Sequence, residues 1–92
     1  MYLKREFSDD ELMAQIVSYL WDQGAWGERY KNYTQMKNRL SKVVNNNGKN
    51  VERKVKMLSS KNWITIKKNG DTISLNPIYK IMIKNFRDQY LI

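Results

Sequence analysis

Basic, amide and hydroxyl side chains recur between residues 49 and 60 at a spacing suited to binding nucleic acid. If this stretch is a helix that turns by about 100° per residue, its apolar side carries Val51, Val55 and Leu58. The opposite side then carries Lys49, Arg53, Lys56 and Ser60. A guanidinium can bind guanine O6 and N7 together, while amines and amides can bind base edges or phosphates. The candidate contact residues of this stretch are therefore Lys49, Asn50, Arg53, Lys54, Lys56 and Ser60.

Two further groups of cations flank this stretch. Lys67 and Lys68 precede an Asn-Gly pair, and Lys37 and Arg39 lie in an earlier segment with helical spacing. Such side chains are suited to phosphate or minor-groove contacts, which position a protein on a duplex without reading its sequence. Each of them taken alone is better explained as an ordinary solvated charge, so the prediction depends on the whole group.

Charge is distributed unevenly along the chain. The net charge is +8, but residues 1–30 hold 3 basic and 6 acidic side chains, while residues 31–92 hold 14 basic and 3 acidic ones. A basic part beside a mildly acidic part favours a polyanionic partner over a uniformly solubilising charge. The alternative, that a lysine-rich chain simply has a basic surface, stays open on composition alone.

The residue types required by many catalytic and metal sites are missing. The chain contains no Cys and no His, so a zinc site built on them, a disulfide and a Cys- or His-based mechanism are excluded. The acidic run Asp9–Glu11 is better explained as the first turn of a helix, where the helix dipole favours carboxylates. We therefore expect no enzymatic activity, no bound metal and no cofactor.

Apolar spacing and capping residues place the first helix. Ser8 and Glu11 form a capping box, in which each side chain bonds the backbone of the other residue. Apolar residues then repeat at helical spacing as far as Trp21, and Gly24 ends the pattern. Residues 24–33 are expected to form a loop that has room for a short strand.

Two more helices are expected before residue 62. Thr34 is a candidate N-cap for the second helix. The apolar side of that helix would carry Met36, Leu40, Val43 and Val44. Residues 45–48 predict a turn, and a third helix is expected from about Lys49 to about Lys61. Asn62 can end this helix because asparagine tolerates the left-handed conformation that closes many helices.

A β-hairpin is predicted around Asn69-Gly70, the strongest local signal in the sequence. This pair is preferred in two-residue type I′ turns, and alternating apolar residues flank it on both sides. The register that follows pairs Ile66 with Ile73 and Ile64 with Leu75. All four apolar side chains then lie on one face of the hairpin.

A last helix is predicted to start at Asn76 and Pro77, a cap followed by the residue favoured in a first helical turn. It carries more apolar residues than one buried stripe requires, namely Ile78, Tyr79, Met82, Ile83, Phe86 and Tyr90. We therefore expect residues 77–92 to be a dimerisation element in a symmetric homodimer. The alternative is that this helix packs on the first helix of the same chain.

The segment from Val51 to Ile64 resembles small prokaryotic winged-helix regulators, in which a recognition helix runs through a leucine into a lysine-glycine-leucine-isoleucine strand. Leu58 and Lys61 match that leucine and lysine, and Trp63-Ile64 match the apolar pair. Asn62 departs from the pattern, because glycine is usual there. Residues 33–40 are similar to the opening of the family's second helix, and the last helix is similar to the dimerisation helices of MarR-like regulators.

The resemblance covers about residues 8–76 and implies one domain over residues 1–92, mainly α with a small β-hairpin: a winged helix-turn-helix with an additional C-terminal helix. The fold alone does not imply DNA binding. The basic outward side of residues 49–60 and the apolar last helix instead predict sequence-specific binding of double-stranded DNA by a homodimeric transcription regulator. A cytoplasmic location is expected because the opening MYLKREFSDDEL has no signal-peptide h-region. The competing function is a winged-helix adaptor that binds protein within a replication or partition assembly. No apolar run reaches the roughly 20 residues needed to cross a bilayer, so no membrane partner is expected.

Overall fold

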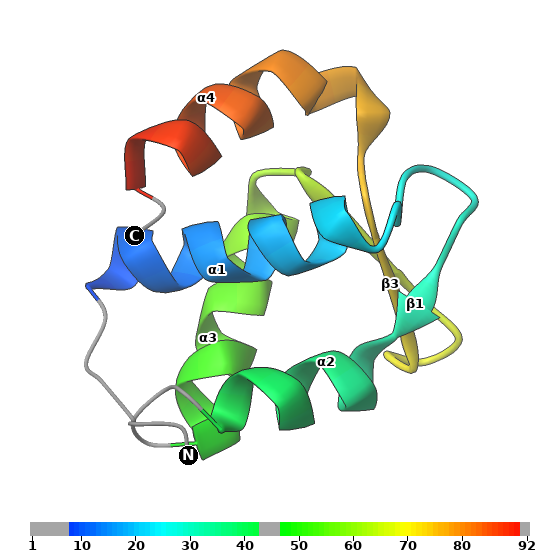
Figure 1. Cartoon of the computed structure of the whole chain (residues 1–92). Helices are drawn as coiled ribbons and strands as arrows, with labels where there is room; N and C mark the ends of the chain where they lie inside the picture. The colour runs from blue at the N-terminus through cyan, green and yellow to red at the C-terminus, as the bar shows by residue number, and fades with distance from the viewer. Residues whose placement is uncertain (1–7, 43–46, 91–92) are drawn as a thin grey trace.

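Four α-helices and a three-stranded sheet make up the part of the chain that the computed structural model describes, residues 8–42 and 47–90. The elements are α1 (Asp9–Asp22), β1 (Lys31–Asn32), α2 (Tyr33–Ser41), α3 (Asn47–Ser60), β2 (Ile64–Lys67), β3 (Thr72–Leu75), the 3₁₀ helix η1 (Pro77–Tyr79) and α4 (Lys80–Tyr90). Helix α1 crosses the middle of the molecule between α4 and α2, and α3 runs across it from behind (Figure 1). None of the helices described is both long and apolar enough to span a membrane.

The capping box predicted at the start of α1 is confirmed. The Glu11 amide donates to Ser8 Oγ at 3.2 Å, and the Ser8 amide donates to Glu11 Oε1 at 2.9 Å. The apolar residues that follow give α1 a broad buried side made by Leu12, Met13, Ile16, Val17 and Leu20. Because α1 packs against α2, α3, α4 and β3, it is the central helix of the core.

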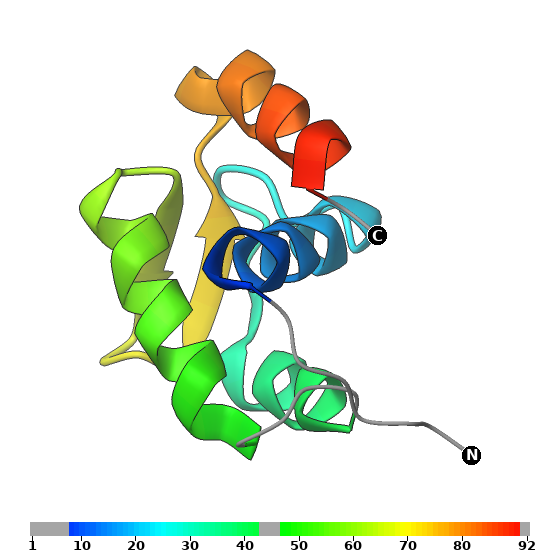
Figure 2. The same cartoon turned by 90° about the vertical axis from the view of Figure 1, so that its left-hand side faces the viewer.

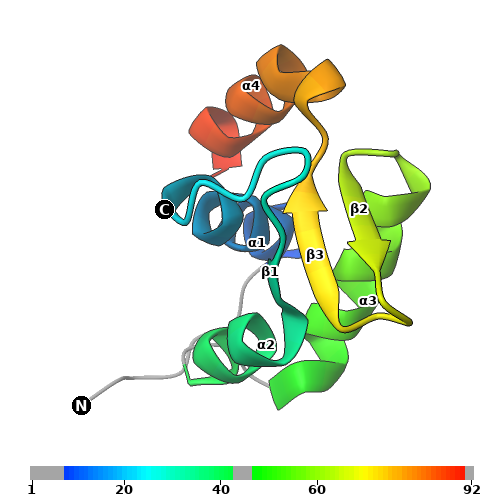
Figure 3. The ribbon, with the colours of Figure 1, turned by 90° about the vertical axis from the view of Figure 1, so that its right-hand side faces the viewer.

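The sheet is antiparallel with strand order β1-β3-β2, so β3 lies in the middle (Figure 3). The predicted hairpin register is confirmed, since Ile64 pairs with Leu75 and Ile66 pairs with Ile73. The short strand expected between the first two helices is β1, which pairs Lys31 with Ile73. Sequence periodicity could not identify its partner, because two residues are too few to show an alternation.

The hairpin turn has the predicted centre but is wider than the two-residue turn expected. The strands end at Lys67 and Thr72, one residue pair before the pair that would flank Asn69-Gly70. Asn69 and Gly70 have φ of 56° and 93°, as type I′ turns require, but Lys68 also has a positive φ of 55°. A residue in this conformation cannot continue a strand, and Lys68 therefore belongs to the turn.

Strand β3 is buried on both faces and ties the segment after α1 to the sheet. The Leu75 amide donates to the Ala25 carbonyl at 2.6 Å, and the Gly27 amide donates to the Leu75 carbonyl at 2.9 Å. Ser74 has no exposed surface, and its hydroxyl donates to the Gly27 carbonyl at 2.9 Å. Residues 25–27, between α1 and β1, are thus held against β3.

The ends of α2 and α3 differ in part from those predicted. Thr34 is not the N-cap of α2: Asn32 is, because β1 leads directly into the helix and Asn32 Oδ1 accepts from the Gln35 amide at 2.9 Å. Helix α3 begins at Asn47, two residues before the expected start. Its predicted end is confirmed, since Asn62 has a φ of 64°. The predicted positions of residues 43–46 lie outside the described residues.

Helix α4 packs against its own chain, which corrects the dimerisation set expected for it. The Asn76 cap is confirmed, because Asn76 Oδ1 accepts from the Ile78 amide at 3.1 Å. Ile83 is completely buried in the same core as α1, and Tyr79 and Phe86 pack partly against that core. Ile83 is therefore not available to a second chain. Three apolar side chains of η1 and the start of α4 are exposed to solvent. Their exposed fractions are 83% for Ile78, 76% for Ile81 and 55% for Met82.

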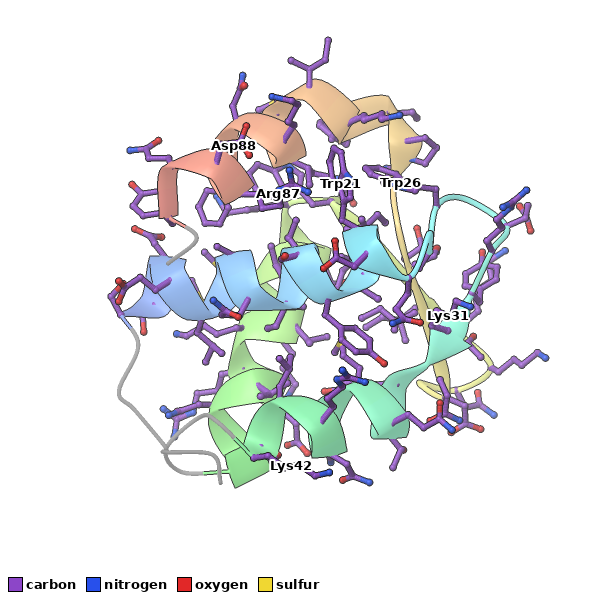
Figure 4. The ribbon with its side chains drawn as sticks, viewed as in Figure 1. Trp21, Trp26, Lys31, Lys42, Arg87 and Asp88 are labelled. Atoms are coloured by element: carbon purple, nitrogen blue, oxygen red, sulfur yellow. The ribbon has the colours of Figure 1, made fainter. Side chains whose placement is uncertain are left out.

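A stacked cation and two indoles fill the space between α4 and α1. The Arg87 guanidinium lies 4.3 Å from the Trp21 ring centroid, and the edge of that ring meets Trp26 with the centroids 5.0 Å apart. Figure 4 shows Arg87 pointing from α4 towards Trp21 on α1, and Arg87 Nη2 also lies 3.3 Å from Asp88 Oδ1. On the other side of the helix, the Phe86 ring packs against Trp63 at 5.3 Å. Helix α4 is thus anchored on two sides.

Replacing Ile83 with alanine should destabilise the protein far more than the same change at Ile81. Ile83 is completely buried and Ile81 is exposed, so only the first change leaves a cavity in the core. We expect a loss of about 2–5 kcal/mol for Ile83→Ala and a change within about 0.5 kcal/mol for Ile81→Ala, measured by urea unfolding. Equal losses would contradict the packing of α4 described here.

Candidate nucleic-acid interface

Helix α3 and the β2–β3 turn reach the same side of the molecule. Figure 2 shows α3 along one edge with the turn beside that edge, and Figure 3, from the opposite direction, also places both on one side. The inward side of α3 carries Val51, Val55 and Leu58, all buried as the spacing predicted. The opposite side of α3 is consequently free of packing contacts with the core.

Three of the predicted contact residues lie together on this outward side. Arg53, Lys56 and Ser60 are exposed. Neither Arg53 nor Lys56 has a carboxylate within 4.0 Å among residues 8–42 and 47–90. The Ser60 hydroxyl donates to the Lys56 carbonyl at 3.0 Å, which leaves its oxygen able to accept. Asn50 is half-buried beside them, and the side chain of Lys49 lies outside the described residues.

Lys54 is a correction to the predicted set, because its amine turns into the protein. The residue is 8% exposed, and Nζ lies 2.9 Å from Asp9 Oδ1 at the start of α1. Nζ also lies 3.6 Å from the Met57 sulfur. One residue after Arg53, position 54 is rotated by about 100° around the helix, and that rotation takes it from the outward side to the side facing α1.

Lys37 is paired with an acid of α3 and links α2 to that helix. Its Nζ lies 2.9 Å from Glu52 Oε1, and this hydrogen bond and the charge of Glu52 raise the pKa of Lys37. Burial raises the pKa of the neighbouring Tyr33, and the negative charge of Glu52 adds to the effect. Lys37 therefore orients the two helices, and its charge is partly neutralised where a phosphate would bind.

Arg39 lies on the far side of α2 from Lys37, which separates it from the other predicted cations. It lines a polar groove between α1 and α2 together with Lys42, Tyr19, Asp22 and neighbouring amides. Lys42 extends from the last turn of α2 (Figure 4). Positions two apart on a helix differ by about 200° in direction, so Lys37 and Arg39 cannot serve one surface.

The two hairpin lysines differ in their surroundings. Lys67 Nζ lies 5.5 Å from the centroid of the Tyr30 ring. A hydrogen bond to Tyr30, with further contributions from the charges of Tyr30 and Glu28, raises the pKa of Lys67. Lys68 is exposed within the turn itself. The sequence analysis did not consider Asp71, an exposed acid in the same turn. Its negative charge disfavours the binding of an anion beside it.

No protein-family model, curated protein or solved structure matches this chain. The function of the chain is therefore inferred from the geometry of the described residues. Within that part of the chain, Asp and Glu residues form no group of three that could hold a metal ion. The candidate interface consists of two parts. One is the outward side of α3, with Arg53, Lys56 and Ser60, and the other is the β2–β3 turn, with Lys68.

The ion pair between Lys54 and Asp9 should stabilise the protein, and Asp10 provides a matched control. Both acids lie in the first turn of α1, where either one interacts favourably with the helix dipole, but only Asp9 faces the nearly buried amine. Asp9→Ala should lower the free energy of unfolding by about 1 kcal/mol more than Asp10→Ala. In a Lys54→Met background the two losses should become equal, as measured by urea unfolding, and a persistent difference would contradict the pair.

Proposed function

We propose that this chain is a winged helix-turn-helix protein that binds double-stranded DNA and acts as a dimeric transcription regulator. The observation that carries the proposal is the outward side of α3, where exposed Arg53 and Lys56 lie opposite a buried apolar stripe. Three helices followed by a hairpin, with β1 added to the hairpin as a third strand, are typical of winged-helix domains. The arrangement of the elements and the position of the charges thus favour the same function.

Helix α3 has the dimensions of a reading helix. Its 14 residues correspond to about 21 Å at 1.5 Å per residue, and a B-DNA major groove about 12 Å wide admits one α-helix. Arg53 lies in the middle of α3, where a guanidinium can bind guanine O6 and N7. Lys56 lies about one turn further along, within reach of a second base edge or a phosphate.

The hairpin turn is the second contact in this proposal. Lys68 is exposed in the β2–β3 turn, and this turn lies on the same side of the molecule as α3 (Figure 2). A phosphate contact here would hold the protein in register without reading bases. Asp71 restricts this contact to the Lys68 side of the turn, because a carboxylate repels the backbone of a duplex.

An adaptor that binds protein through an acidic first helix is the second candidate. The structure gives less support to that version, because Asp9 is paired with Lys54 and Glu11 is bonded to the Ser8 amide. The exposed residues Ile78, Ile81 and Met82 favour association of some kind. We assign this surface to a second copy of the chain.

Salt-dependent DNA binding tests the proposal, with Lys68→Ala compared with Lys84→Ala. Both changes remove one exposed lysine, but Lys84 lies on α4, where it pairs with Asp88 at 2.9 Å. By fluorescence anisotropy on a labelled duplex, Lys68→Ala should flatten the log-log salt dependence by about 0.9, the value for one lost phosphate contact. Lys84→Ala should leave the slope unchanged, and no binding of the wild-type chain to any duplex would overturn the proposal.

The same titration, carried out with Arg53→Ala, distinguishes a contact that recognises bases from a contact that only holds the protein on the phosphate backbone. Loss of a bidentate contact should cost about 1–3 kcal/mol on a site selected from random duplexes and little on unrelated DNA. The variant should fold, because Arg53 is exposed and alanine favours a helix. If the selected sequence and its affinity stay the same, α3 is not the reading element.

Dimerisation is assigned to the start of α4. Ile81 and Met82 follow Ile78 by three and four residues, so both lie on the same side of the helix as Ile78. A stable dimer buries about 800 Å² per partner, more than three side chains supply, so polar residues around them must contribute a rim. A symmetric dimer would place two copies of α3 about 34 Å apart, one turn of DNA.

The double change Ile81→Ser with Met82→Ser should convert the dimer to a monomer. Both side chains are exposed in the single chain, so the core and the thermal unfolding of the monomer should change little. Sedimentation at micromolar concentration measures the association, and Asn38→Ser, an exposed polar change on α2 away from α4, is the control. A wild-type chain that is monomeric under these conditions would contradict the dimer.

A further inference from the structure

Met57 is an apolar side chain in the surface that α3 presents to solvent. It is 41% exposed, while the other large apolar residues exposed in the described chain all lie in η1 and α4. It follows Arg53 by four residues, so the two side chains are neighbours one turn apart on the helix. An apolar group thus lies beside the guanidinium that the proposed function places in the major groove.

Met57 makes a contact on the side of α3 that faces α1. Its sulfur lies 3.6 Å from Lys54 Nζ, and that amine is held by Asp9 at 2.9 Å. Because Lys54 is buried, the thioether has a defined neighbour on one side and solvent on the other. The exposed part of Met57 is therefore held at the edge of the outward side of α3.

We propose that Met57 reads a thymine by contacting its C5-methyl group, next to the base pair bound by Arg53. This assignment rests on the proposed function. In the major groove the base edges offer hydrogen-bond donors and acceptors, and the thymine methyl is their apolar feature. A thioether is flexible and polarisable and packs well against such a group. The preferred site should accordingly contain a thymine beside the guanine.

The surroundings of Met57 favour DNA over a protein partner. The exposed cations Arg53 and Lys56 flank it, and the centres of protein interfaces are depleted in charged residues. The exposed apolar group of η1 and α4 differs, because Ile78, Ile81 and Met82 fall within five consecutive residues. A single apolar side chain among cations suits a polyanion that carries isolated methyl groups.

Replacing thymine with deoxyuridine tests the assignment, because this change removes only the methyl group. In the site selected by the wild-type protein, each thymine is replaced in turn and affinity is measured by anisotropy. One replacement should weaken wild-type binding about fourfold, the factor that corresponds to burying one methyl group. Met57→Ala should bind both duplexes equally, and Met57→Leu, which keeps an apolar side chain, should retain most of the preference.

The outcomes separate this assignment from the proposed function. If the wild-type chain binds no duplex, both are overturned. If it binds but no deoxyuridine weakens it, or if the loss is the same in wild type and Met57→Ala, only the role of Met57 is overturned. Lys84→Ala, which changes an exposed residue of α4 that belongs to neither proposed interface, should keep the thymine preference, and circular dichroism checks that each variant is folded.

Discussion

The burial of β3 on both faces is the constraint on which the rest of the structure depends. Both of its edges are paired, and Ser74 in its middle is sealed from solvent with its hydroxyl bonded to Gly27. A shift by one residue would exchange its two faces, burying Thr72 and breaking the bonds to the segment after α1. The strand therefore has one register, and that register sets where the hairpin turn lies relative to α3.

The rotation of one helix sorts neighbouring cations into different tasks. Arg53 and Lys54 are adjacent in sequence, yet the first points to solvent and the second binds Asp9 within the protein. Glu52, an exposed acid one turn before Lys56, holds Lys37 of α2. These two ion pairs connect α3 to α1 and to α2, and the exposed cations are then presented by a helix whose rotation about its own axis is restricted.

Features set by local chemistry could be predicted from the sequence, and features set by distant partners could not. The capping box at Ser8, the end of α3 at Asn62 and the hairpin register each depend on residues a few positions apart. The ion pair of Lys54 depends on an acid 45 positions away, and periodicity gives no information on such a partner. The N-cap was misplaced at Thr34 for a related reason, since the end of β1 is set by its pairing with β3.

The anchoring of α4 on α1 has a consequence for how the chain folds as it is made. Trp21 and Arg87, which stack together, are 66 positions apart in the sequence, and Ile83 fills the core to which α1 contributes. Contacts this distant raise the contact order and form late. Synthesis proceeds at about 5–20 residues per second. The apolar side of α1 that faces α4 therefore stays exposed for seconds before α4 has been made. Cooperative folding of the core therefore follows synthesis of α4, and the nascent chain is most prone to aggregate just before that helix emerges.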